Sequence, residues 1–192
     1  MEYSVVCCGG TFDLLHEGHK AFLEFAANQG GTLIVGLTSD EFLKLHKPGV
    51  SVQLYDIRKQ EIEKFFQSIS YTNFEIVPLN DIYGPAVDSD FDAIVVTKDT
   101  RAGADKINEI RKSNQLKPLE IIVCSLKKSD QGIISSTNIR SGKMSREGTV
   151  FVKEEWMNKN LVLPEKVRDA FKRPIGELIF DSEDWIENQR FD

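Results

Sequence analysis

The chain has 192 residues, of which 41% are hydrophobic and 28% charged, a balance typical of a folded globular protein rather than a disordered or fibrous one. Its formal net charge of −6 argues against nucleic-acid binding as the main task, because a phosphate backbone requires a basic face. No apolar run approaches the roughly 20 residues of a membrane helix, and the first residues lack the pattern of a secretory signal. We therefore expect a folded protein of the cytoplasm with no membrane and no nucleic-acid partner.

Apolar runs of strand length recur along the chain and predict five strands. They cover residues 4–8, 32–38, 73–78, 92–97 and 119–124. Each run is nearly continuous in Val, Ile and Leu, which indicates burial on both faces of a parallel sheet. Between the runs, residues 18–28, 57–69 and 102–113 have the apolar spacing of amphipathic helices. The expected fold is α/β: a doubly wound, Rossmann-like parallel sheet of five strands with helices on both faces.

A fold of this kind binds ligands at the carboxyl ends of its strands, so the loops after the strands are the places to search for a site. The alternation of strands and helices stops near residue 143. We therefore predict one α/β domain over residues 1–143 and a C-terminal extension over residues 144–192.

The three cysteines predict neither a disulfide nor a structural metal site. Cys7 and Cys8 are adjacent in the first strand, so their side chains point to opposite faces. Cys124 stands alone after another apolar run, without the paired spacing of a zinc site. We interpret all three as small core residues.

The loop after the first strand carries the most informative pattern. Residues 9–19 read GGTFDLLHEGH, so Gly10 leads to a helix start at which His16 and His19 flank Gly18. Glycines let a ligand approach the backbone, and a helix start offers free N–H groups to phosphate. The two imidazoles can donate hydrogen bonds to phosphate oxygens and, when charged, stabilise negative charge during phosphoryl chemistry. The alternative is a tight turn beside two surface or core histidines, but their joint position favours a phosphate site.

A second polar segment follows the fifth strand, where residues 134–140 read ISSTNIR. Ser136 or Thr137, preceded by Ser135, can cap a short helix whose N–H groups and hydroxyls hold the outer phosphates of a nucleotide. Arg140, one turn further along, can clamp β- and γ-phosphate oxygens with two parallel hydrogen bonds. The alternative is an ordinary helix cap with a solvated arginine.

Together these two segments resemble the signatures of the HxGH nucleotidyltransferase superfamily, which is shared with class I aminoacyl-tRNA synthetases. Residues 36–42 (GLTSDEF) and 117–120 (KPLE) make the chain similar to the archaeal-type phosphopantetheine adenylyltransferases of coenzyme A synthesis. In that family the 4′-phosphate of phosphopantetheine attacks the α-phosphate of ATP, giving dephospho-coenzyme A and pyrophosphate. The resemblance implies Mg²⁺ that is carried with ATP; because no carboxylate cluster accompanies Asp13, we predict no metal ligand in the protein.

The resemblance also implies roles for single residues near the first loop. Thr11 would orient the acceptor phosphate in a site shaped by Gly10 and Phe12, while the two histidines hold ATP phosphates. Lys44, on a helix that follows the second strand, is similar in position to a family lysine that bridges the acceptor and the α-phosphate. Lys47 is a near competitor for that role.

Two further segments belong to the predicted site. Arg58 lies at the start of the helix predicted over residues 57–69, and it either reaches the same anions or is a solvated first-turn residue. Thr97 and Arg101 follow the fourth strand, in the loop where the family closes over the nucleotide. Arg101 is expected to contact phosphate there.

Several alternatives stay open at this level. Residues 163–168 and 174–176 resemble the start of archaeal GTP-dependent dephospho-coenzyme A kinase, which implies a fused or partner kinase, and the alternative is a generic docking helix. A glycerol-phosphate cytidylyltransferase or an FAD synthase shares the first-loop pattern, and a non-catalytic nucleotide-sensing module is the rival outside enzymes. A homo-oligomer is among the expected assemblies.

Overall fold

Five parallel strands form a single sheet in the order β3-β2-β1-β4-β5. The structure, a computed structural model, describes residues 3–125 and 134–149. The strands are β1 (Tyr3–Gly10), β2 (Gly30–Thr38), β3 (Phe74–Leu79), β4 (Ala93–Thr97) and β5 (Glu120–Cys124). All five predicted strands are confirmed, with ends that move by at most two residues. The chain reverses its direction of travel across the sheet between β1 and β4, and ligands of open α/β sheets bind beyond the strand ends at such a reversal.

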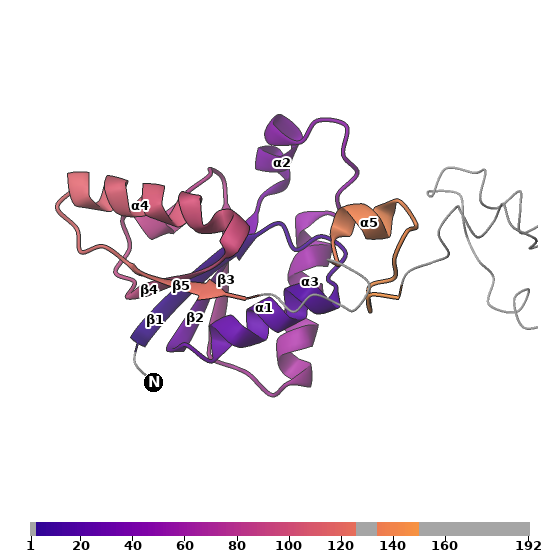
Figure 1. The fold of residues 1–192 in the computed structure, drawn as a ribbon, viewed down its shortest axis with the longest axis horizontal. Helices are drawn as coiled ribbons and strands as arrows, with labels where there is room; N and C mark the ends of the chain where they lie inside the picture. The colour runs from indigo at the N-terminus through magenta and orange to yellow at the C-terminus, as the bar shows by residue number, and fades with distance from the viewer. Residues whose placement is uncertain (1–2, 126–133, 150–192) are drawn as a thin grey trace, which may run out of the picture.

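Helices cover both faces of the sheet, as predicted. α1 (Glu17–Ala27) and α3 (Tyr55–Ser68) lie on one face, and α4 (Arg101–Ser113) lies on the other (Figure 1). Shorter elements follow the strand ends: α2 (Asp40–His46), the 3-10 turns η1 (Gly84–Val87) and η2 (Lys98–Thr100), and α5 (Ser136–Arg140). None of the described helices is long and apolar enough to span a bilayer.

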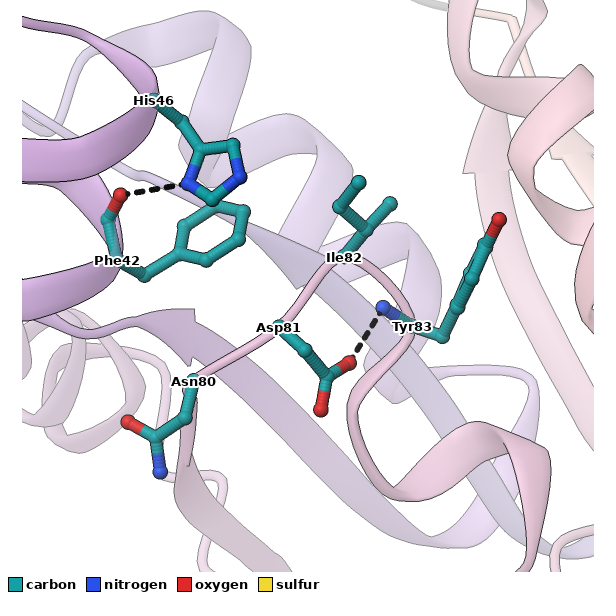
Figure 2. Close-up of a pocket in the computed structure, with 6 residues that line it drawn as sticks. All are labelled: Phe42, His46, Asn80, Asp81, Ile82 and Tyr83. Carbon is teal, nitrogen blue, oxygen red and sulfur yellow. Dashed lines mark hydrogen bonds between the residues drawn. The ribbon is translucent and has the colours of Figure 1, made fainter.

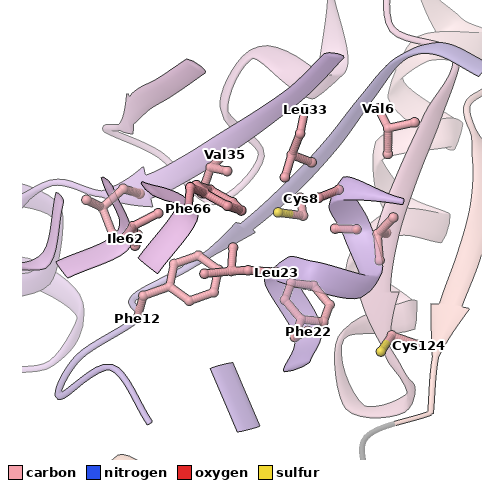
Figure 3. Packing of buried hydrophobic residues seen from close by; sticks show 14 of the residues in the cluster. Val6, Cys8, Phe12, Phe22, Leu23, Leu33, Val35, Ile62, Phe66 and Cys124 are labelled. Carbon is pink, nitrogen blue, oxygen red and sulfur yellow. The ribbon is translucent and has the colours of Figure 1, made fainter. Parts of the chain in front are cut away.

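The larger core cluster fills the space between the sheet, α1 and α3 (Figure 3). It includes Leu23, Leu33, Val35, Ile62 and Phe66, none of them more than 1% exposed. Burial of each large apolar side chain contributes about 1.5–3 kcal/mol, so this face holds the sheet rigid under the loop after β1.

The smaller core cluster lies between the sheet and α4, where Ile94 and Val96 pack with Ala104 and Ile107. Cys8 belongs to the larger cluster and Cys7 to the smaller one, so the prediction that they point to opposite faces is confirmed. Burial raises the pKa of the Cys7 thiol to about 12, which makes it an inert core group.

Part of the predicted extension lies against the α/β domain. Met144 is 4% exposed, and the carbonyl of Arg146 accepts a hydrogen bond from the N–H of Glu17 at 3.0 Å. Residues 144–149 therefore dock at the start of α1, while a boundary near residue 143 stays a prediction. The kinase-like segments 163–168 and 174–176 lie outside the described residues.

Candidate active site

The loop between β1 and α1 has an unusual backbone conformation at two residues that are not glycine. Phe12 has φ of 48° and Leu14 has φ of 50°, in the left-handed region that non-glycine residues rarely adopt. The ring of Phe12 is 3% exposed, and a Cβ at Gly10 would lie 3.0 Å from it. Gly10 is thus required by the packing of Phe12, which supports the site from within the core rather than lining it with its side chain.

His16 and His19 form one stacked pair at the start of α1. Their ring centroids are 3.6 Å apart with an interplanar angle of 18°. His16 is the N-cap of the helix, and its Nδ1 accepts a hydrogen bond from the backbone N–H of His19 at 3.3 Å. A Cβ on Gly18 would lie 3.2 Å from the His16 ring, so the glycine between the histidines leaves room for this ring where a larger residue would be tight.

Both imidazoles are neutral at pH 7 in the free protein. Burial lowers the pKa of His16 to about 4 and that of His19 to about 3. Because Nδ1 of His16 accepts a hydrogen bond, its proton is on Nε2, which leaves that atom as a donor. The pair therefore offers neutral donors to an anion rather than fixed positive charges.

The first turn of α1 offers fewer free amides than the sequence led us to expect. The N–H of Glu17 donates to the carbonyl of Arg146, and the N–H of His19 donates to His16. Within the described residues this leaves the amide of Gly18 without such an acceptor. This helix start consequently has few free backbone donors, so the side chains of the histidines are the main donors that it can offer an anion.

The second motif lies against the first loop. Ser135, not Ser136 or Thr137 as predicted, is the N-cap of α5, and its Oγ accepts from the N–H of Asn138 at 3.2 Å. The hydroxyl of Ser136 donates to the carbonyl of Asp13 at 2.7 Å, while Thr137 is exposed. Ser136 does not cap the helix, because its hydroxyl is hydrogen-bonded to the first loop.

Asp13 joins the two motifs through its side chain. Its carboxylate is 3% exposed, forms an ion pair with Arg140 and accepts the N–H of Gln53 at 2.8 Å. In residues 3–125 and 134–149, no three His, Cys, Asp or Glu side chains gather as a metal site. The alternative of a solvated Arg140 is thus wrong, and its role as a phosphate clamp stays a prediction.

Two residues that sequence analysis did not single out hold the same loop. The side chain of Gln53 accepts a hydrogen bond from the N–H of Leu14 at 2.7 Å. The carboxylate of Glu61 accepts one from the N–H of Leu15 at 3.2 Å and forms an ion pair with Arg146 at 2.7 Å. Neither residue belongs to a motif, so only their position in space reveals them.

Lys47 reaches the first loop. Its Nζ lies 3.4 Å from Oγ1 of Thr11; Lys44 and Lys47 are both exposed, but within the described residues Lys44 makes no such contact with the loop. Lys47 is at the C-cap of α2, so the end of that helix directs it towards the loop. Of the two candidates, the structure brings Lys47 to Thr11.

Arg58 is fully buried, and the expectations of a solvated or anion-binding side chain are both wrong. Its guanidinium donates to backbone and side-chain oxygens of the protein instead. One signal in the sequence could have revealed this burial, since Arg58 precedes Ile62 and Phe66 at intervals of four on the buried face of α3.

Thr97 is the last residue of β4 and Arg101 the first residue of α4, beside the reversal of the sheet. Thr97 forms a reciprocal cap with Thr100. The Arg101 side chain is 56% exposed and 3.9 Å from Asp105, a contact loose enough to leave it available to an anion. Their contact with nucleotide stays a prediction.

A cavity of about 350 Å³ lies between the sheet and α4. Its walls come from the last residues of β1 and β2, from β4, from residues 81–86 and from α4, and they are mainly apolar. Its lining includes Gly10 and Thr38 at the carboxyl ends of β1 and β2, and Ile107 on α4. The cavity therefore extends from the strand ends near the first loop under α4.

An outer pocket of about 270 Å³ opens where α2 faces residues 80–83 (Figure 2). The rings of Phe42 and His46 stack with their centroids 4.0 Å apart. The Asp81 carboxylate accepts a hydrogen bond from the backbone N–H of Tyr83 at 2.8 Å. Phe42 and Tyr83 line both hollows, so the outer pocket adjoins the larger cavity.

Comparison with known proteins agrees with this geometry. Residues 7–142 match the family model described as cytidylyltransferase-like. A phosphopantetheine adenylyltransferase of Thermococcus gammatolerans is 41% identical over 154 residues, covering 79% of this chain and 97% of that protein. One of Methanothermobacter thermautotrophicus is 36% identical over 151 residues, covering 78% of this chain and 90% of that protein. A crystal structure of an Archaeoglobus fulgidus protein of unknown function aligns with a TM-score of 0.59 and 32% identity, over 67% of this chain and 94% of that one.

Proposed function

The chain belongs to the phosphopantetheine adenylyltransferase family, within the cytidylyltransferase-like proteins, and from that premise we propose that it transfers the adenylyl group of ATP to 4′-phosphopantetheine. The products are dephospho-coenzyme A and pyrophosphate, in the biosynthesis of coenzyme A. The observation that carries the proposal is the mainly apolar cavity whose lining includes Gly10, the residue before Thr11 in the first loop.

The shape of this cavity matches an acceptor with a phosphate at one end and a long uncharged arm at the other. Pantetheine is such an arm, and the mainly apolar walls at Val95, Ala104 and Ile107 suit its carbon chain. Glycerol phosphate has no arm to bury there, so the cavity disfavours the cytidylyltransferase alternative. FMN has a large apolar part as well, which makes FAD synthase the second candidate.

The chemistry requires positioning and charge stabilisation more than proton transfer. The attacking phosphate oxygen is already an anion, so no general base is needed. Thr11 and Lys47 lie together where they would orient the acceptor phosphate. His16 and His19 would donate hydrogen bonds to the phosphates of ATP, and Arg140 would assist the departure of pyrophosphate.

ATP is proposed to enter as its Mg²⁺ complex. Asp13, the carboxylate nearest the histidines in the first loop, is engaged with Arg140 and Gln53. A metal ion would therefore be held by the triphosphate that brings it. The bound ion would neutralise charge on the phosphates, and the protein would position the reacting groups.

Pyrophosphate release tests the proposal. The purified full-length chain is given MgATP or MgCTP, with phosphopantetheine, FMN or glycerol phosphate offered in turn. Release with ATP and phosphopantetheine alone is the expected result. Release only with FMN would move the protein to the FAD synthases, whereas tight ATP binding without release from any pair would favour a nucleotide sensor.

A further inference from the structure

Side chains from outside the strained loop after β1 hold several of its backbone groups. Gln53, before α3, bonds Leu14; Glu61, within α3, bonds Leu15; and Ser136 of α5 bonds Asp13. Left-handed backbone at Phe12 and Leu14 costs about 1–3 kcal/mol per residue and persists only where the surroundings fix it. The supports of this loop are therefore part of what gives the site its shape.

Among these supports, Arg58 is the one that reaches Thr11, the residue that the proposed function places beside the acceptor phosphate. Its Nη1 donates to the carbonyl of Thr11 at 3.0 Å and lies 3.3 Å from Oγ1 of Thr38 at the end of β2. Its Nε donates to the carbonyl of Gln53 at 2.8 Å. One guanidinium thus joins the first loop, the end of β2 and the segment before α3.

The fourth contact of Arg58 extends this connection to α2. Its Nη2 pairs with Asp40 at 2.9 Å, and the same carboxylate accepts the N–H of Tyr55 at the start of α3. Asp40 is the first residue of α2, the helix whose C-cap is Lys47. The loop that carries Thr11 and the helix that presents Lys47 are thereby fixed to one buried side chain.

We propose that Arg58 is a positioning residue for adenylyl transfer, which holds Thr11 and Lys47 in mutual register through the Thr11 carbonyl and Asp40. The inference rests on the proposed function for its kinetic consequence. All three guanidinium nitrogens are engaged with the protein, so Arg58 acts through other residues and touches no substrate. Lysine cannot replace it, because a single ammonium cannot reach acceptors on three segments with a planar fork of donors.

Arg111 offers a matched control on the other face of the sheet. It is 2% exposed and donates to the carbonyls of Lys117, Ala86 and Ser89, so it is also a buried arginine that joins backbone segments. It makes none of these bonds to the loop after β1. Substitution of either arginine leaves buried carbonyls without donors, so similar losses of melting temperature are expected.

The kinetic test compares Arg58→Met, Arg58→Lys and Arg111→Met in the full chain. Calorimetric titration with MgATP gives the fraction of intact sites and the Kd, and kcat is expressed per ATP-binding site. We expect Arg58→Met to lower kcat per site about 30- to 100-fold with Kd for ATP changed less than about threefold, because misplacement of reacting groups affects turnover most. Arg111→Met should keep kcat per site at saturation within about threefold of the parent chain. Equal kcat per site in the two Met variants would overturn the proposal.

A milder pair of variants decides the matter if Arg58→Met does not fold. Asp40→Asn keeps an oxygen acceptor for the N–H of Tyr55 but removes the charge that pairs with Arg58. Both Asp40→Asn and Arg58→Lys should lower kcat per ATP site by about three- to tenfold. Unchanged kcat in both would contradict the proposal.

Hydrogen exchange separates this inference from the proposed function. If the parent chain releases no pyrophosphate with any acceptor, the proposed function fails, but the role of Arg58 in holding the loop is still measurable. The amides of Leu14 and Leu15 should then exchange faster in Arg58→Lys than in Arg111→Lys, because loss of the guanidinium loosens Gln53 and the loop. Equal exchange rates in the two variants would overturn it.

Discussion

His16 and His19 stack on each other but differ in what their ring nitrogens do. Nδ1 of His16 is occupied by the N–H of His19, whereas Nδ1 of His19 is buried and has no partner within the described residues. An unpaired buried polar atom costs about 1–3 kcal/mol, so the pair has one nitrogen that gains from a new partner. At the residue scale, the histidine pair is thus neutral and offers hydrogen bonds rather than positive charge.

The low pKa values of the histidines predict a loss of stability in mild acid. Below pH 6.5 the unfolded chain binds protons at both imidazoles, whereas the folded chain keeps His16 and His19 neutral until their pKa values of about 4 and about 3. The stability that they contribute is therefore fully present above pH 6.5 and is lost as the pH falls towards about 3. Thermal unfolding should show a smaller drop in Tm from pH 7 to pH 5 for the His16→Asn/His19→Gln variant than for the parent chain.

His46→Gln, at an exposed position on α2, is the control for that experiment and should keep the parental pH dependence. A parental dependence in the His16→Asn/His19→Gln variant as well would show that other groups cause the acid sensitivity.

The position of Lys47 beside Thr11 predicts which lysine matters for turnover. Lys47→Ala should lower kcat/KM for the acceptor by about 10- to 100-fold, because it removes a positive charge beside the acceptor phosphate. Lys44→Ala should have a smaller effect, since within the described residues it is Lys47, not Lys44, that contacts Thr11. Steady-state kinetics of both variants, with Lys59→Ala on α3 as a control for loss of a surface lysine, checks this order; the reverse order would restore Lys44 to the predicted role.

At the scale of elements, α5 is attached to the loop after β1 across more than a hundred residues of chain. The hydroxyl of Ser136 bonds the carbonyl of Asp13, and Arg140 pairs with the carboxylate of the same residue. Because Asp13 is nearly fully buried, its charge requires the guanidinium. The pair therefore specifies where the second motif docks against the first loop.

A double-mutant cycle measures this attachment. Arg140→Met should lower the free energy of unfolding by about 2–3 kcal/mol, below the range for fully buried pairs because the Arg140 side chain is 29% exposed. Asp13→Asn/Arg140→Met should cost less than the sum of the single changes, since no buried charge is then left unpaired. Urea denaturation gives the three differences, and strict additivity would contradict a direct interaction.

At the scale of the whole molecule, the reversal of strand order between β1 and β4 gathers the site. It places the first loop, the loop that carries Thr97 and Arg101, and the cavity beneath α4 at one end of the sheet. The family match over residues 7–142 spans the same part of the chain. The kinase-like resemblance, a homo-oligomer and a cytoplasmic location stay predictions.

The extent of this site predicts that residues 150–192 are dispensable for adenylyl transfer. A chain truncated after Thr149 keeps the contact of Arg146 with Glu61 and should retain kcat within about threefold of the full chain. Truncation after Lys143 should reduce both Tm and activity, because it removes Met144 and Arg146 from the start of α1. Pyrophosphate release by the two truncated chains is the measurement, and loss of activity in the longer one would assign the extension a part in the reaction.

The sequence by itself determined the parallel sheet, its three long helices and the two motifs, because these depend on local signals. Continuous apolar runs specify buried strands, glycines specify tight backbone, and two histidines at a helix start specify a polar site. The residues that depend on long-range contacts could not be identified in this way. The roles of Gln53 and Glu61 and the burial of Arg58 arise from packing between segments 39 to 47 residues apart in sequence, and the contact of Lys47, rather than Lys44, with Thr11 depends on where α2 ends. Only the tertiary structure decided these, because a charge or an amide has no preferred partner until the fold brings one within hydrogen-bonding distance.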